Sequence, residues 1–96
     1  MRREEALSIL SAHRSEFDRF HVKSLSLFGS VARDEAGPGS DIDVLVEFAK
    51  PIDLFAFIEL KQYLEALLGC DVDLGTPRSL REHARESATL DLVHVE

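Results

Sequence analysis

The chain is poor in cysteine, in positive charge and in long apolar runs, and each shortage excludes a class of protein. Its 96 residues include one cysteine, Cys70, so no internal disulfide framework can form and a reducing compartment is indicated. Acidic residues outnumber basic ones by 18 to 11, and a net charge of −7 lacks the broad positive field that nucleic acids attract. No apolar run approaches the roughly 18 residues of a membrane span, and no apolar segment follows the charged N-terminus as in a secretory signal. We therefore expect a cytoplasmic protein without direct contact with nucleic acid or membrane.

The remaining composition is that of one small folded domain. Apolar residues make up 45% of the chain and charged residues 30%, which is ordinary for a globular protein. Neither repeats nor low-complexity tracts divide the sequence, so a single domain over residues 1–96 is predicted. Cys70 is expected to act as a small buried apolar side chain and not as a reactive thiol.

Hydrophobic periodicity predicts helices and strands in alternation. Apolar residues spaced by three and four predict helices over Glu4 to about Phe20 and over Leu54 to Leu68. Asp53 caps the second helix and Gly69 follows its last residue. Alternation with period two predicts strands at 22–28, 41–48 and 70–74, and turn or cap residues mark a short helix at 31–34 and another from Arg78 to about Ser87. Residues 90–95 fit either a last strand or a continued helix.

The most informative stretch runs from Leu25 to Phe48 and predicts a strand, a glycine turn, a short helix, a loop and a second strand. The turn at Gly29 and Ser30 offers backbone N–H groups, a hydroxyl and the positive end of a helix to an anion. In the second strand Asp41 and Asp43 leave the same face, with Cα atoms roughly 6.6 Å apart. Two carboxylates so placed suit Mg²⁺, which takes oxygen ligands from carboxylates, substrate phosphates and water. A carboxylate pair opposite a phosphate cradle indicates nucleoside triphosphate chemistry.

A third carboxylate is expected from the strand at 70–74. Val72 and Leu74 face the core in this pattern, so Asp71 and Asp73 share the opposite face. If this strand lies beside the second one, one of these two carboxylates can join Asp41 and Asp43.

Gly29-Ser30, ten further residues and then Asp41-x-Asp43 resemble the signature of the DNA polymerase β-type nucleotidyltransferase superfamily. The finer pattern, GSVAR followed by GSDIDVLVEF, is similar to the minimal nucleotidyltransferases, many of which are encoded as antitoxins beside HEPN-domain toxins. The motif covers about a quarter of the chain, and the length, the order of elements and Val72-Asp73-Leu74 fit the same pattern. The resemblance implies a small α/β fold, with a mixed sheet of three or four strands, helices mainly on one face and the acidic site on the other.

The resemblance also implies which acids form the site. Asp73 is preferred over Asp71 as the third acid, because it precedes an apolar residue at the end of its strand. Asp41, Asp43 and Asp73 would hold two Mg²⁺ ions that clamp the attacking and leaving oxygens of a phosphoryl transfer. Asp73 would in addition orient or deprotonate the attacking hydroxyl.

Four further residues are expected to bind the triphosphate of ATP. Gly29 and Ser30 would hold the β- and γ-phosphates with their backbone N–H groups and the serine hydroxyl. Arg33 lies on the same side of the short helix as Ser30, and either contacts phosphate or pairs with an acid at the rim of the site. Ser40 either adds a hydroxyl contact or caps the loop.

The function that the resemblance implies is transfer of AMP from ATP to a tyrosine hydroxyl of a cognate HEPN ribonuclease toxin, within a hetero-oligomer. One alternative is a binding module that neutralises the toxin by covering its surface, and a weaker one is transfer to an antibiotic or other small molecule. The Gly-Ser turn and the three acids favour the enzyme, because a pure binder needs none of them. The chain has no room for an acceptor domain, so the acceptor is expected to come with a partner. The broad apolar stripe of residues 54–68 fits core packing alone or a partial contact with that partner.

Overall fold

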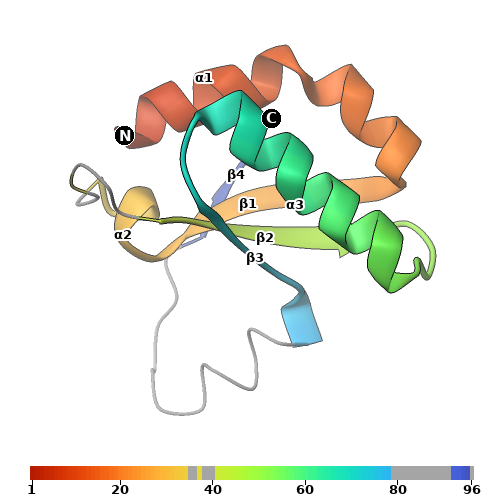
Figure 1. Cartoon of the computed structure of the whole chain (residues 1–96). Coiled ribbons are helices and arrows are strands. Elements are labelled where there is room, and N and C mark those ends of the chain that lie inside the picture. The colour runs from red at the N-terminus through yellow and green to blue at the C-terminus, as the bar shows by residue number, and fades with distance from the viewer. Residues whose placement is uncertain (35–36, 38–40, 79–91, 96) are drawn as a thin grey trace.

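The four strands form one mixed sheet, in a computed structural model that describes residues 1–34, 37, 41–78 and 92–95 (Figure 1). In spatial order the sheet is β3-β2-β1-β4, with bounds β1 (Val22–Phe28), β2 (Ile42–Phe48), β3 (Val72–Gly75) and β4 (Val93–His94). Strand β1 pairs antiparallel with β2 and with β4, whereas β2 pairs parallel with β3. The predicted α/β fold with a mixed sheet is confirmed.

Three helical segments cover one face of this sheet. They are α1 (Arg3–Ala12), the 3₁₀ helix η1 (Arg14–Phe20) and α3 (Leu54–Leu68), and Figure 1 shows them on the same side. Ile42, Val44 and Val46 of β2 are fully buried beneath them. Because strand side chains alternate, the intervening residues of β2 point to the other side. We call this second side, which carries Asp43 and Glu47, the acidic face.

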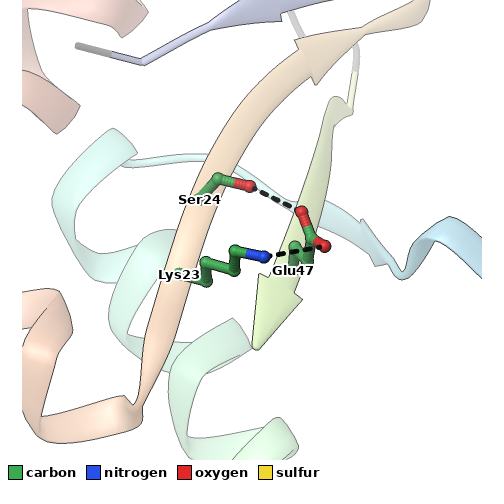
Figure 2. A network of polar contacts seen from close by, with 3 residues as sticks. All are labelled: Lys23, Ser24 and Glu47. Atoms are coloured by element: carbon green, nitrogen blue, oxygen red, sulfur yellow. Dashed lines mark hydrogen bonds and ion pairs between the residues drawn. The ribbon is translucent and has the colours of Figure 1, made fainter. Parts of the chain in front are cut away.

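A β-bulge at Lys23 determines which residues at the start of β1 face the core. Val22 pairs with Phe48 and Ser24 pairs with Glu47, so Lys23 is the extra residue between them. The extra residue lets Val22 pack on the core although Ser24 lies on the acidic face. Figure 2 shows the consequence, since Lys23 and Ser24 both reach one carboxylate: Lys23 Nζ lies 3.7 Å from Glu47, and the Ser24 hydroxyl donates to it at 3.4 Å.

The single helix predicted from Glu4 to about Phe20 is wrong, because the chain forms two segments there. Helix α1 ends at Ala12, and η1 begins at Arg14. Between them His13 has φ −109° and ψ 16°, outside the helical range, and its ring Nδ1 is hydrogen-bonded to the carbonyl of Ile9 at 2.9 Å.

The packing of two phenylalanines explains the change to a 3₁₀ helix. In a 3₁₀ helix residues i and i+3 lie on the same side, whereas an α-helix turns them about 60° apart. Phe17 and Phe20 therefore both contact Tyr63 of α3, with ring centroids 6.0 Å and 5.4 Å away. Spacings of three and four residues do not distinguish the two helix types, so the sequence pattern missed the break.

Helix α3 has the predicted bounds and the predicted caps. The Asp53 carboxylate accepts a hydrogen bond from the Ala56 N–H at 2.8 Å, and Gly69 ends the helix with φ +70°. The buried side chains of the helix are Leu60, Leu64 and Leu68. Its first turn is different, because Leu54 and Phe55 are 69% and 78% exposed. Core packing alone therefore does not account for the whole apolar stripe.

The remaining elements lie close to their predicted positions. The short helix α2 spans Gly29–Ala32, slightly earlier than predicted, and β3 begins two residues later than predicted. The C-terminal ambiguity is resolved as a strand, since β4 pairs with β1 and the buried Ser26 hydroxyl is hydrogen-bonded to His94 Nδ1 at 2.9 Å. Pro77 and Arg78 are helical, and the rest of the helix predicted to Ser87 lies outside the described residues. Among the described helices, none is long and apolar enough to cross a bilayer.

Candidate active site

The turn from β1 into α2 brings Gly29 into direct contact with Asp43. Phe28 and Asp43 are paired across β1 and β2, so the turn begins beside this acid. A Cβ atom built on Gly29 would lie 2.2 Å from Asp43 Oδ2, and Gly29 has φ +70°. Glycine is the residue that satisfies both conditions, because it tolerates a positive φ and has no Cβ. An anion bound by the N–H groups of this turn would therefore lie next to the Asp43 carboxylate.

The parallel ladder places a second acid beside the first. Asp43 and Asp73 are in direct register on β2 and β3, which are roughly 4.8 Å apart as neighbouring strands. Burial raises the pKa of Asp43 above its ordinary value, and the negative charges of Asp73 and Asp41 raise it further. A side-chain hydrogen bond with Asp73 adds to this rise in pKa, while the positive charge of Arg33 opposes it. The structure thus brings Gly29, Arg33 and the three predicted acids into one neighbourhood.

The oxygen atoms of these carboxylates are the type of ligand that a hard divalent cation prefers. Within the described part of the chain, no group of three His, Cys, Asp or Glu side chains is already converged as a metal site. Asp41 and Asp73 are exposed, however, so rotation of their side chains can bring them to an ion beside Asp43. The repulsion that raises the pKa of Asp43 is one that a bound cation would relieve, and oxygen donors are those that Mg²⁺ prefers.

Comparison with known proteins identifies the family of this chain. Residues 9–93 match the nucleotidyltransferase domain family. The chain belongs to this family. Among its relatives is the protein adenylyltransferase MntA of Thermococcus cleftensis, which is 45% identical over 96% of this chain and 94% of the relative. The predicted resemblance to minimal nucleotidyltransferases is thereby confirmed.

Solved structures lead to the same family. One that is assigned as a minimal nucleotidyltransferase has a TM-score of 0.72 and 38% identity, covering 85% of this chain and 88% of that one. A crystal structure of the toxin–antitoxin pair MntA-HepT matches with a TM-score of 0.57 and 26% identity, over 98% of this chain and 68% of that one. A toxin–antitoxin crystal structure with AMP-PNP matches with a TM-score of 0.58 and 33% identity, over 72% and 58% of the two chains.

The remaining residues that were predicted to bind ATP are Ser30, Arg33 and Ser40. Ser30 is the second residue of α2 and is partly exposed. Arg33 follows α2, and its backbone N–H bonds to the Gly29 carbonyl at 3.3 Å. Ser40 lies outside the described residues. Because α2 has four residues, a helix macrodipole adds little, and any anion would be bound by individual N–H groups and the Ser30 hydroxyl.

Asp71 and Cys70 of the nucleotidyltransferase stay outside this group. Asp71 is exposed, and its carbonyl oxygen accepts the Ile42 N–H at 3.0 Å, which starts the pairing of β2 with β3. Burial raises the pKa of the Cys70 thiol, and the positive N-terminus opposes that rise only in part. Cys70 is only partly buried, in contrast to the prediction, but it packs against the core. A thiol with a raised pKa is also a weak nucleophile, which agrees with the packing role predicted for Cys70.

Two residues without any signal in the sequence hold the far end of α2. The Asp34 carboxylate accepts a hydrogen bond from the Arg3 backbone N–H at 3.0 Å. The Arg3 guanidinium donates to the Ala32 carbonyl at 3.1 Å. Positions 3 and 34 are far apart along the chain, so no motif or periodicity could connect them.

Proposed function

We propose that this nucleotidyltransferase is an antitoxin that transfers AMP from ATP to a tyrosine hydroxyl of a HEPN-domain toxin. The observation that carries the proposal is the contact of the Gly29 turn with Asp43, with Asp73 in register beside it. The protein adenylyltransferase activity of the Thermococcus cleftensis relative supports transfer of AMP to a protein. The MntA-HepT pair supports a toxin as the partner, and AMP-PNP in a related complex supports ATP as the donor.

In this proposal the turn and the acids share the work of binding ATP. The N–H groups of Gly29 and Ser30, with the Ser30 hydroxyl, bind the β- and γ-phosphates. Asp41, Asp43 and Asp73 would hold Mg²⁺, as two ions. When bound, the ions neutralise phosphate charge and stabilise the oxygens that attack and leave.

The chemical step is a substitution at the α-phosphorus of ATP. The tyrosine hydroxyl oxygen forms a bond to the α-phosphorus, and the bond from this phosphorus to the oxygen that bridges to the β-phosphate breaks. Pyrophosphate leaves, and the hydroxyl proton passes to the Asp73 carboxylate, which acts as general base. Arg33, whose charge already reaches Asp43, stabilises the negative charge that develops on pyrophosphate.

A protein acceptor also agrees with the surface of α3. Leu54, Phe55 and Ile58 are 69%, 78% and 40% exposed, and they lie within one and a half turns of the helix. Exposed apolar side chains that lie together in this way often mark a site of contact with another protein. The proposal places the protein in the cytoplasm, which the unpaired Cys70 supports.

The test is the intact mass of the HEPN-domain partner after incubation with this protein, ATP and Mg²⁺. We expect a gain of one or more AMP units, and no gain with the Asp41→Asn/Asp43→Asn variant. Full neutralisation of the toxin by that variant, without any mass gain, would instead establish an antitoxin that acts by binding. Modification of an aminoglycoside but not of the toxin would point to a small-molecule transferase.

A further inference from the structure

Helix α2 is too short to hold its own position. It has four residues, and a single helical turn is unfavourable in isolation because nucleation fixes several dihedral angles for one hydrogen bond. Contacts with the rest of the fold must therefore place it. Val31 and Ala32 supply one part of this anchoring, since they are 0% and 2% exposed in the core.

The second part is a reciprocal contact between the start of α1 and the end of α2. The Asp34 carboxylate accepts the first N–H of α1, at Arg3, where a helix leaves a donor without an intrahelical partner. The Arg3 guanidinium in turn donates to the carbonyl of Ala32, the last residue of α2. Each helix end thus satisfies a backbone group of the other. Helix α1 is a firm support, because its residues Ala6 and Leu10 are fully buried.

The contact lies on both sides of Arg33 in the chain. Ala32 and Asp34, its two neighbours, are the residues that bond to Arg3. Asp34 also has φ +60°, a left-handed conformation that costs a residue with a Cβ stability, although Asp and Asn adopt it more readily than most of these residues. The residues on both sides of Arg33 are therefore held by hydrogen bonds, and these bonds fix the direction in which Arg33 leaves the chain.

We propose that Arg3 and Asp34 are positioning residues for the nucleotide. By fixing the end of α2 they set the direction of Arg33 and the distance of the Gly29-Ser30 turn from Asp43. This inference rests on the proposed function, in which that turn and Arg33 contact the phosphates of ATP. Neither Arg3 nor Asp34 touches the reacting atoms.

The test measures the binding of AMP-PNP in the presence of Mg²⁺ by titration calorimetry. Asp34→Gly removes the carboxylate and also relieves the left-handed strain, so its Tm stays close to that of the wild type. Its dissociation constant for AMP-PNP is expected to rise roughly tenfold, as for loss of a hydrogen bond to a charged group. Asp34→Asn keeps an acceptor oxygen and is expected to restore most of the affinity.

Two further variants separate positioning from general destabilisation. Arg3→Met removes the guanidinium bond to Ala32 and keeps the backbone N–H that Asp34 accepts, so its combination with Asp34→Gly removes both hydrogen bonds. The double variant is expected to weaken binding by less than the product of the single effects, because both bonds hold the same end of α2. Asp53→Ala is the matched control, since it removes an equivalent carboxylate cap from α3, which contributes no predicted site residue. It is expected to lower Tm and to leave the affinity for AMP-PNP unchanged.

Each outcome decides between the two proposals. A wild-type protein that binds no AMP-PNP would overturn the proposed function and, with it, the positioning role. Tight binding by the wild type and equally tight binding by Asp34→Gly would overturn the positioning role alone. Equal weakening by Asp53→Ala would also overturn it, because loss of stability would then explain the change.

Discussion

Replacement of Gly29 by alanine is the sharpest test of the site geometry. The new Cβ would lie 2.2 Å from Asp43 Oδ2, whereas contacts under 3.0 Å force a shift, so the carboxylate must retreat by about 1 Å. Misplacement of a reacting group by about 1 Å can cost on the order of 100-fold in rate. The positive φ adds about 1–2 kcal/mol of backbone strain, because alanine carries the Cβ that a left-handed conformation crowds. We therefore expect AMP transfer to fall roughly 100-fold and the Tm to fall by about 4–16 °C.

Gly69→Ala is the control for this prediction. Gly69 has the same φ of +70°, but nothing lies within 4 Å of a Cβ built there. This variant should be destabilised by the same backbone strain of about 1–2 kcal/mol and keep its rate of AMP transfer. Rates from mass spectrometry at saturating ATP, with thermal unfolding measured in parallel, give both quantities. Full activity in Gly29→Ala, or an equal loss of activity in Gly69→Ala, would refute the inference that the turn and Asp43 are in functional contact.

Three further predictions concern the acids and the exposed end of α3. Ionised Asp43 destabilises the folded state, because the pKa of Asp43 is raised there. This penalty is absent at pH values below the pKa of Asp43 in the unfolded state, and it is fully present once the pH has risen above its pKa in the folded state. Asp43→Asn should therefore unfold at a higher temperature than the wild type at neutral pH, with a difference that shrinks towards acidic pH; a difference independent of pH would contradict burial and charge repulsion as its cause. Mg²⁺ at ten times its dissociation constant should stabilise the wild type by about 1.4 kcal/mol in thermal unfolding, and an equal gain in Asp41→Asn/Asp43→Asn would exclude these acids as ligands. Phe55→Ser should leave AMP-PNP affinity and Tm unchanged and weaken capture of the toxin in a pull-down, because this side chain is 78% exposed.

Local signals in the sequence were sufficient for β2 and α3. Strict alternation gave the bounds of β2 to within a residue, and the Asp53 cap and Gly69 gave both ends of α3. The pairing of Gly29-Ser30 with Asp41-x-Asp43 likewise predicted which strand ends meet. In each case the residues that decide the structure lie close together in the chain.

The features that were missed depend on contacts between distant residues. The break after Ala12 follows from the packing of Phe17 and Phe20 on Tyr63, more than forty positions away. The contact of Arg3 with Asp34 joins segments that no periodicity connects. A tertiary contact of this kind leaves no mark in a single sequence, because neither the type of one partner nor its position in the chain identifies the other.

The register of β2 with β3 has a consequence for how such a protein can change over evolutionary time. A slip by one residue would carry Asp73 into the core and expose Val72 and Leu74, so selection for a stable sheet preserves the spacing of Asp43 and Asp73 without any selection for catalysis. A descendant that had lost activity would keep this backbone almost unchanged. Its loss would be visible in the identities of individual residues, above all those at 41, 43 and 73. For close homologues, those three letters are therefore more informative about activity than the similarity of the fold.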